Sequence, residues 1–201
     1  MKKILLLLAD GFEAVEASVF TDVLGWNQTD GDGSTQLITV GRKAKLKCTF
    51  NFTVIPEMQL DEVHVDDFDA LAIPGGFEDA GFYEDAYSED FLNLIREFDK
   101  AGKIIASICV GALPVGKSGV LKVRNATTYT VNTGDFELSL RQAQLAEFGA
   151  NILKDQRIVI DKNIITSYNP STAFEVAFTL LEMLTNKENC THIKKLMGFN
   201  A

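Results

Sequence analysis

Cys109 lies in a sequence pattern that is typical of a reactive cysteine. Residues 103–112 read KIIASICVGA, an apolar run that ends at Cys109 and continues at once with small residues. A buried strand followed by small-x-Cys-x-Gly is typical of a nucleophile elbow, a sharp strand-to-helix turn that tolerates only small neighbours. The segment therefore predicts a nucleophilic Cys109, and the alternative is an inert cysteine at the end of a core strand.

The expected turn also predicts the acidity of Cys109. At the first turn of the following helix, unpaired N–H groups and the helix macrodipole would stabilise a thiolate. We therefore expect a depressed pKa and enhanced nucleophilicity for this cysteine.

Two acidic residues follow the first apolar run of the chain. Glu13 and Glu16 are three residues apart in the first turn of an expected helix, so their carboxyl groups lie on one helix face. Each alone is explained by the preference for acidic residues at helix N-termini. A partly buried carboxyl group close to a thiolate would instead have a raised pKa and would donate or shuttle a proton.

A pair of glycines follows another apolar run. Gly75 and Gly76 come after Pro74, and they either form a simple turn or bring backbone N–H groups close to Cys109. Together with the N–H of Val110, these groups would form an oxyanion hole.

The elements that must position these residues alternate between strands and helices. Continuous apolar runs are typical of strands buried on both faces of a parallel sheet, and they occupy residues 4–9, 37–40, 70–73, 104–108 and 164–167. Helical patterns lie between them over residues 13–26, 88–101, 136–148 and 172–184. The alternation predicts a doubly wound α/β fold with its ligand site at the carboxyl ends of the strands. Residues 48–56 alternate like an added antiparallel ribbon.

Composition limits the classes of function. A chain of 201 residues with 46% hydrophobic and 23% charged residues predicts one domain over residues 1–201. A net charge of −9 argues against nucleic acid or an anionic membrane as a partner. The apolar run from Ile4 to Ala9 meets Asp10 too early for a signal peptide, and no run approaches the roughly 20 apolar residues of a membrane span.

Cysteine usage predicts the compartment and the absence of a metal. Cys48, Cys109 and Cys190 are odd in number and widely spaced, which fits neither a disulfide framework nor a metal site. A reducing cytoplasm fits best. No phosphate-binding glycine loop or His/Cys ligand cluster occurs, so we expect no organic cofactor and no metal.

Four segments, taken in this order, resemble the ThiJ/PfpI superfamily: ADGFExxE at 9–16, IPGG at 73–76, IASICVG at 105–111 and TSxxPxTxFE at 166–175. The resemblance covers nearly the whole chain. It implies a flavodoxin-like, glutamine-amidotransferase-like sandwich that forms a homodimer. It also implies an oxidation-prone elbow cysteine, here Cys109, hydrogen-bonded to a protonated glutamate, here Glu16. Gly75 and Gly76 match the glycine pair of the family's oxyanion pocket.

The chain also departs from the superfamily. In the peptidase branch of the superfamily that this chain resembles, a His follows directly after the nucleophile, whereas this chain has Val110 there. Tyr129 stands where related members often carry a His, and a phenol is a poor base at neutral pH. His64 and His192 match no catalytic position and are expected on the surface. Peptidase activity is therefore not expected.

Residues and resemblance together predict a cysteine-dependent enzyme that acts on small reactive carbonyl compounds, as glyoxalases and deglycases do. Cys109 would add to the aldehyde as a hemithioacetal while Glu16 moves the protons. The N–H groups of Gly76 and Val110 would hold the oxyanion, and Tyr129 would orient the substrate. The alternative is a non-enzymatic oxidative-stress sensor or holdase chaperone, in which the pocket stabilises a sulfinate of Cys109.

Overall fold

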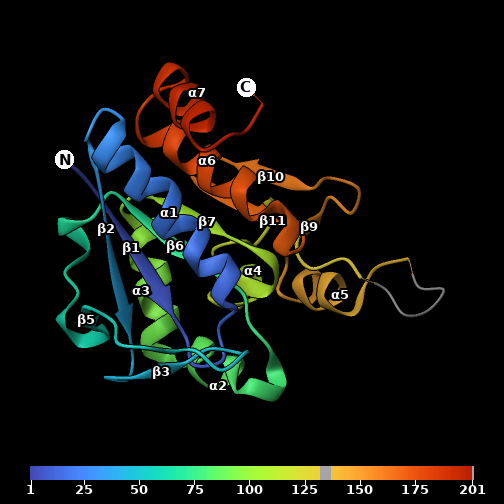
Figure 1. The fold of residues 1–201 in the computed structure, drawn as a ribbon. Helices are drawn as coiled ribbons and strands as arrows, with labels where there is room; N and C mark the ends of the chain where they lie inside the picture. Colours follow the sequence, from blue (N-terminus) through green and yellow to red (C-terminus); the bar gives the residue numbers. More distant parts are fainter. Residues whose placement is uncertain (132–136, 201) are drawn as a thin grey trace.

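A seven-stranded sheet forms the centre of the molecule, with helices on both faces (Figure 1). The computed structural model describes residues 1–131 and 137–200. Along the sheet the strand order is β10-β11-β7-β6-β1-β2-β5, and every pair of neighbours is parallel except β10 and β11. The strands are β1 (Lys2–Leu8), β2 (Thr35–Gly41), β5 (Met58–Gln59), β6 (Ala70–Ile73), β7 (Ile104–Ser107), β10 (Ile158–Asp161) and β11 (Ile164–Ser167). The predicted doubly wound α/β fold is confirmed.

The five predicted strands are all present, and the apolar runs of the inner strands are buried on both faces of the sheet, whereas most of β2 is only partly buried. All four residues of β6 and of β11 are buried, as are the last five residues of β1. Strand β10 was not predicted. It lies at the edge of the sheet, its apolar run covers only residues 158–160, and Ile160 is exposed.

Helices pack against both faces of this sheet. On one face α1 (Ala14–Asp30), α6 (Ala173–Leu184) and α7 (Lys187–Leu196) contact one another. On the other, α3 (Glu89–Lys100) packs on β6 and β7, and α4 (Ala112–Lys117) contacts both α3 and α5 (Leu140–Glu147). The helix predicted over residues 136–148 is observed as the shorter α5, and residue 136, the first of the predicted range, lies outside the described residues. No helix within the described residues has the length and apolar character needed to cross a bilayer.

The smaller elements connect the layers. Strands β3 (Leu46–Lys47) and β4 (Thr53–Val54) form an antiparallel ribbon, of which only β4 lies within the predicted range 48–56. Cys48 is buried in their connection, where its sulfur accepts a hydrogen bond from the Phe52 N–H at 3.1 Å. The remaining elements are β8 (Asn125–Ala126), β9 (Asn151–Ile152), α2 (Phe82–Ala86) and the 3-10 turns η1 (Leu60–Glu62), η2 (Val65–Asp67), η3 (Glu78–Ala80), η4 (Cys109–Gly111) and η5 (Pro170–Thr172).

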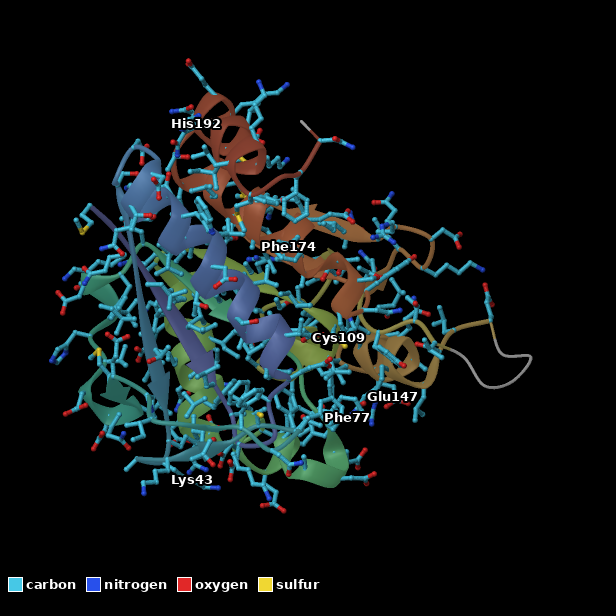
Figure 2. All side chains as sticks on the ribbon, in the orientation of Figure 1. Lys43, Phe77, Cys109, Glu147, Phe174 and His192 are labelled. Atoms are coloured by element: carbon cyan, nitrogen blue, oxygen red, sulfur yellow. The ribbon has the colours of Figure 1, made fainter. Side chains whose placement is uncertain are left out.

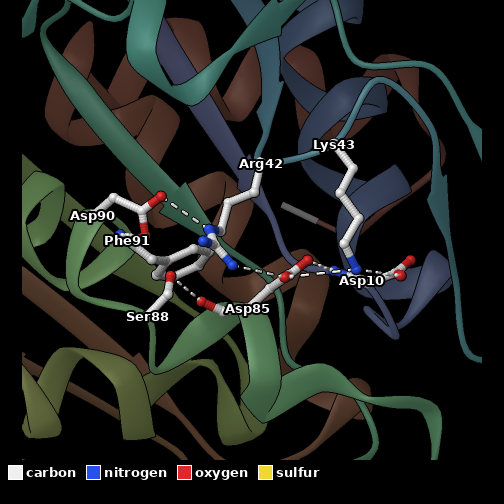
Figure 3. Close-up of polar contacts among 7 residues, drawn as sticks. All are labelled: Asp10, Arg42, Lys43, Asp85, Ser88, Asp90 and Phe91. Carbon is white, nitrogen blue, oxygen red and sulfur yellow. Dashed lines mark hydrogen bonds and ion pairs between the residues drawn. The ribbon is translucent and has the colours of Figure 1, made fainter.

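An ionic network fixes the loop that leads from β1 into α1 (Figure 3). The Asp10 N–H donates to the buried carboxylate of Asp85 at 3.0 Å, and Lys43 pairs with the Asp10 carboxylate at 2.9 Å. Arg42 contacts both Asp85, at 3.1 Å, and Asp90, at 2.9 Å. These contacts compensate the buried charge of Asp85 and hold the start of α1 at the carboxyl end of the sheet.

Candidate active site

Cys109 lies at the sharp turn between β7 and α4. Its φ angle is +55°, in the left-handed region that residues with a side chain rarely adopt. Two residues later, a Cβ atom on Gly111 would lie only 2.6 Å from the Ile73 carbonyl oxygen. The predicted tight strand-to-helix turn with a small neighbour is therefore present. Figure 2 shows Cys109 beside the first turns of α1.

Glu16 projects from the first turn of α1 and is completely buried. Its Oε2 atom accepts a hydrogen bond of 2.6 Å from the Gly75 N–H, and its carboxyl group lies close enough to the Cys109 thiol for each group to shift the pKa of the other. Within the described residues, no N–H or O–H group donates to Oε1. The two residues that the sequence singled out as acid and nucleophile are thus direct neighbours.

The environment of Glu16 favours its protonated form. Burial raises the pKa of Glu16 from 4.5 to about 8, and the neighbouring Glu13 carboxylate adds to the rise, while the Gly75 N–H opposes it. Glu16 therefore keeps its proton over most of the neutral range, in agreement with the sequence prediction.

The predicted depression of the Cys109 pKa is wrong. Burial raises the pKa of the Cys109 thiol, and an ionised Glu16 raises it further. The nearby Val110 N–H lowers the pKa of the thiol but is outweighed. Cys109 is only 5% exposed, so a thiolate would lose most of its hydration. Because each group disfavours ionisation of the other, the pair carries at most one negative charge near neutral pH.

A cavity of about 490 Å³ opens over Cys109, and Gly76, Val110 and Tyr129 also line it. Four of the six predicted site residues therefore meet at one cavity. Glu16 and Gly75 do not line it; Glu16 reaches the site through its contact with the Cys109 thiol.

The two glycines have different surroundings. The N–H of Gly75 is occupied by Glu16, and a Cβ atom there would lie 2.9 Å from Glu16 Oε2. Gly75 thus holds the carboxyl group in place, which differs from the oxyanion role expected for it. The Gly76 N–H has no hydrogen-bond partner among the described residues, so it remains available to a ligand alongside the Val110 N–H.

Sequence reasoning missed several polar residues of the cavity wall, among them Tyr83 on α2 and Arg141 on α5. Neither belongs to a motif, and only the fold brings these helices to Cys109. The two histidines are exposed, as predicted, and neither lines the cavity. Among the described residues, no group of three or more His, Cys, Asp or Glu side chains is arranged to hold a metal ion.

Comparison with known proteins places the chain in a family. The model of the DJ-1/PfpI family matches residues 2–183. The chain belongs to this family. Among its relatives, protein dj-1beta of Drosophila melanogaster is 30% identical over 99% of both chains. The glutathione-independent glyoxalase DJR-1.2 of Caenorhabditis elegans is 28% identical over 96% of this chain and 93% of its own length.

Another relative is named a deglycase. The deglycase PfpI of Pyrococcus furiosus is 27% identical over 86% of this chain and 93% of its own. The crystal structure of Drosophila melanogaster DJ-1beta superposes with a TM-score of 0.84 at 27% identity, covering 100% of this chain and 99% of the other. Family and fold are therefore those that the four sequence segments predicted.

Proposed function

We propose that the protein is a cysteine-dependent enzyme that acts on small reactive carbonyl compounds, in the manner of a glyoxalase or deglycase. The observation that carries the proposal is the contact between the buried carboxyl group of Glu16 and the Cys109 thiol beneath a cavity. The names of the glyoxalase and deglycase relatives support the same reaction class.

The first step joins proton transfer to carbon–sulfur bond formation. In the fraction of molecules with an ionised Glu16, the carboxylate takes the thiol proton as the Cys109 sulfur attacks the aldehyde carbon. The C=O π bond breaks and its electron pair goes to oxygen. The N–H groups of Gly76 and Val110 face this developing oxyanion, and the proton now on Glu16 neutralises it to give the hemithioacetal.

For a 2-oxoaldehyde the remaining steps balance without an external oxidant. Glu16 removes the proton from the former aldehyde carbon and returns it to the neighbouring carbon through an enediol, so one carbon is oxidised and the other is reduced. Water then hydrolyses the resulting thioester, which releases a 2-hydroxy acid and restores the thiol. Tyr129 lines the cavity, and in this proposal it orients the substrate.

Lactate production from methylglyoxal tests this proposal. The wild type should form lactate, whereas Cys109→Ser and Glu16→Gln should lose at least about a hundredfold in kcat/KM. Cys190→Ser is the matched control, because Cys190 is also buried but lies on α7, away from the cavity. Turnover that survives in Cys109→Ser, or no turnover in the wild type, would refute the proposal.

The redox-sensor alternative makes a different prediction in the same experiment. Peroxide reacts with thiolates, and the raised pKa of the Cys109 thiol slows that reaction. A wild type that makes no lactate but gains a single sulfinate at Cys109 under mild peroxide would favour the sensor.

We also propose that the protein works as a homodimer in the cytoplasm, as the resemblance and the cysteine usage imply. Within the described part of the chain all three cysteines are free. Light scattering of the purified protein measures the dimer, and a monomer at micromolar concentration would contradict it.

A further inference from the structure

The cavity above Cys109 is larger than a three-carbon aldehyde requires. Its volume of about 490 Å³ lies in the range of sites that hold drug-sized ligands. The reacting carbonyl group occupies only the floor, at Cys109 and Val110. The rest of the wall is therefore free to bind another part of a larger substrate.

The Tyr83 hydroxyl group is an unsatisfied donor at this cavity. Tyr83 lines the wall, and its hydroxyl oxygen is buried with no hydrogen-bond partner within residues 1–131 and 137–200. A buried hydroxyl without a partner is costly, so the native arrangement favours a ligand that accepts its hydrogen bond. Burial also raises the pKa of Tyr83, which keeps the phenol protonated and able to donate at neutral pH.

Arg141 brings a positive charge to the same part of the wall. Its guanidinium group lies over the Tyr83 ring, 5.2 Å from the centroid, and it is the only basic side chain among the described residues that line the cavity. Two of its five N–H groups are used, by Gln144 at 3.1 Å and by Glu78 at 2.8 Å. The other three N–H groups have no partner among residues 1–131 and 137–200 and are open to a ligand.

The bond between Arg141 and Glu78 is one that a ligand can replace. The Glu78 side chain is 67% exposed, and ion pairs with an exposed partner contribute little. The planar fork of a guanidinium group binds a carboxylate with two parallel hydrogen bonds. The Tyr83 hydroxyl belongs to the same cavity wall and is a second donor for such a carboxylate.

The charges of the cavity orient such a ligand. Glu13 lines the α1 side, next to the proton-transfer pair, and would repel an anion there. Arg141 and Tyr83 come from α5 and α2. On the basis of the proposed function, we infer that the protein acts on 2-oxoaldehydes whose other end is a carboxylate, which Arg141 and Tyr83 bind while Cys109 attacks the aldehyde.

A pair of substrates that differ only in charge tests this inference. The probe is 4,5-dioxopentanoate, and the comparison compound is its neutral methyl ester. In the proposed reaction the enzyme would convert the probe, with uptake of one water molecule, to 2-hydroxypentanedioate. In the wild type, kcat/KM should be at least about tenfold higher for the acid, as a charge-assisted hydrogen bond implies. Equal values for acid and ester would overturn the inference while leaving the proposed function intact.

Variants identify the groups that bind the carboxylate. Arg141→Gln should abolish the preference for the acid, and Tyr83→Phe should reduce it at least about threefold. Glu78→Gln should increase it, because the competing carboxylate is gone; a gain of this kind cannot come from misfolding. Arg157→Gln is the control, since Arg157 forms a similar pair with the exposed Glu175 at 2.6 Å outside the cavity. An unchanged preference in Arg141→Gln would overturn the inference.

Turnover of methylglyoxal but of neither probe would overturn the inference and leave the proposed function intact. A binding measurement decides the question if the wild type turns over none of the three compounds, methylglyoxal included. In that case the proposed function fails, and the ligands are 4-oxopentanoate and its methyl ester, titrated by calorimetry. Tighter binding of the acid that is lost in Arg141→Gln supports the carboxylate site. Equal binding of acid and ester refutes it.

Discussion

Glu16 should make the stability of the protein strongly dependent on pH. Burial raises its pKa from 4.5 to about 8 in the folded protein, so folding favours the protonated acid. For a group with a raised pKa, the contribution to stability is fully present below the unfolded pKa and is lost as the pH rises through the folded pKa. The affected window is therefore about pH 4.5 to 8.

The size of the effect follows from the shift. One pKa unit corresponds to about 1.4 kcal/mol, so full ionisation of Glu16 costs about 5 kcal/mol of the free energy of unfolding. Between pH 5 and pH 8 the expected loss is about 3 to 4 kcal/mol. Glu16→Gln removes the titrating group and keeps a side chain of similar size that accepts the Gly75 hydrogen bond.

Urea unfolding of both proteins at pH 5, 6, 7 and 8 measures this loss. The midpoint of the wild type should fall relative to that of Glu16→Gln as the pH rises, at a constant slope with denaturant. The carboxyl groups whose pKa is lowered by the fold, Asp32, Asp69 and Asp90, stay ionised throughout this range and do not contribute. Parallel midpoints for the two proteins between pH 5 and pH 8 would refute the burial argument.

Three further predictions concern the reaction. Turnover of methylglyoxal should rise about tenfold from pH 6 to pH 7 and level off above the Glu16 pKa of about 8, because the carboxylate is the base; a flat pH–rate profile would contradict this. Tyr129→Phe should raise KM and leave kcat within about threefold of the wild type, whereas a loss of about a hundredfold would make Tyr129 a proton-transfer group. Gly75→Ala should lower kcat at least about tenfold, because the added Cβ would lie 2.9 Å from Glu16 Oε2. Gly25→Ala is the control, since a Cβ atom at this helix position would have no other heavy atom within 4 Å. It should leave kcat unchanged and raise the free energy of unfolding by up to about 1 kcal/mol.

The sequence predicted those parts of the site that depend on local pattern. Apolar runs identified the buried strands. Glu16 and Cys109 follow two of these strands, so the sequence predicted that both lie at the carboxyl ends of the sheet strands. The raised pKa of Glu16 was foreseen, since that argument assumed burial. The pKa of Cys109 was not, because the helix-terminus argument considered only nearby backbone groups, whereas loss of hydration depends on the whole fold.

Other features could not be read from any local pattern. Tyr83 lies on a helix of five residues, and Arg141 comes from a helix more than thirty residues after Cys109. Their meeting over the cavity depends on the packing of α2 and α5, for which the sequence offers no motif. The same holds for the two glycines, because spacing alone does not tell which N–H group donates to Glu16 and which has no partner among the described residues.

The raised pKa values of both Glu16 and Cys109 are consistent with catalysis once the pair is treated as one acid. Two negative charges in so buried a place would be far more costly than one. In the proposed reaction the single negative charge is first on the Glu16 carboxylate and then, as the sulfur attacks, on the substrate oxygen. The Gly76 and Val110 N–H groups would donate hydrogen bonds to this oxygen. At each stage the site holds one negative charge. A fully formed thiolate is therefore unnecessary, because the proton leaves the thiol only as the carbon–sulfur bond forms.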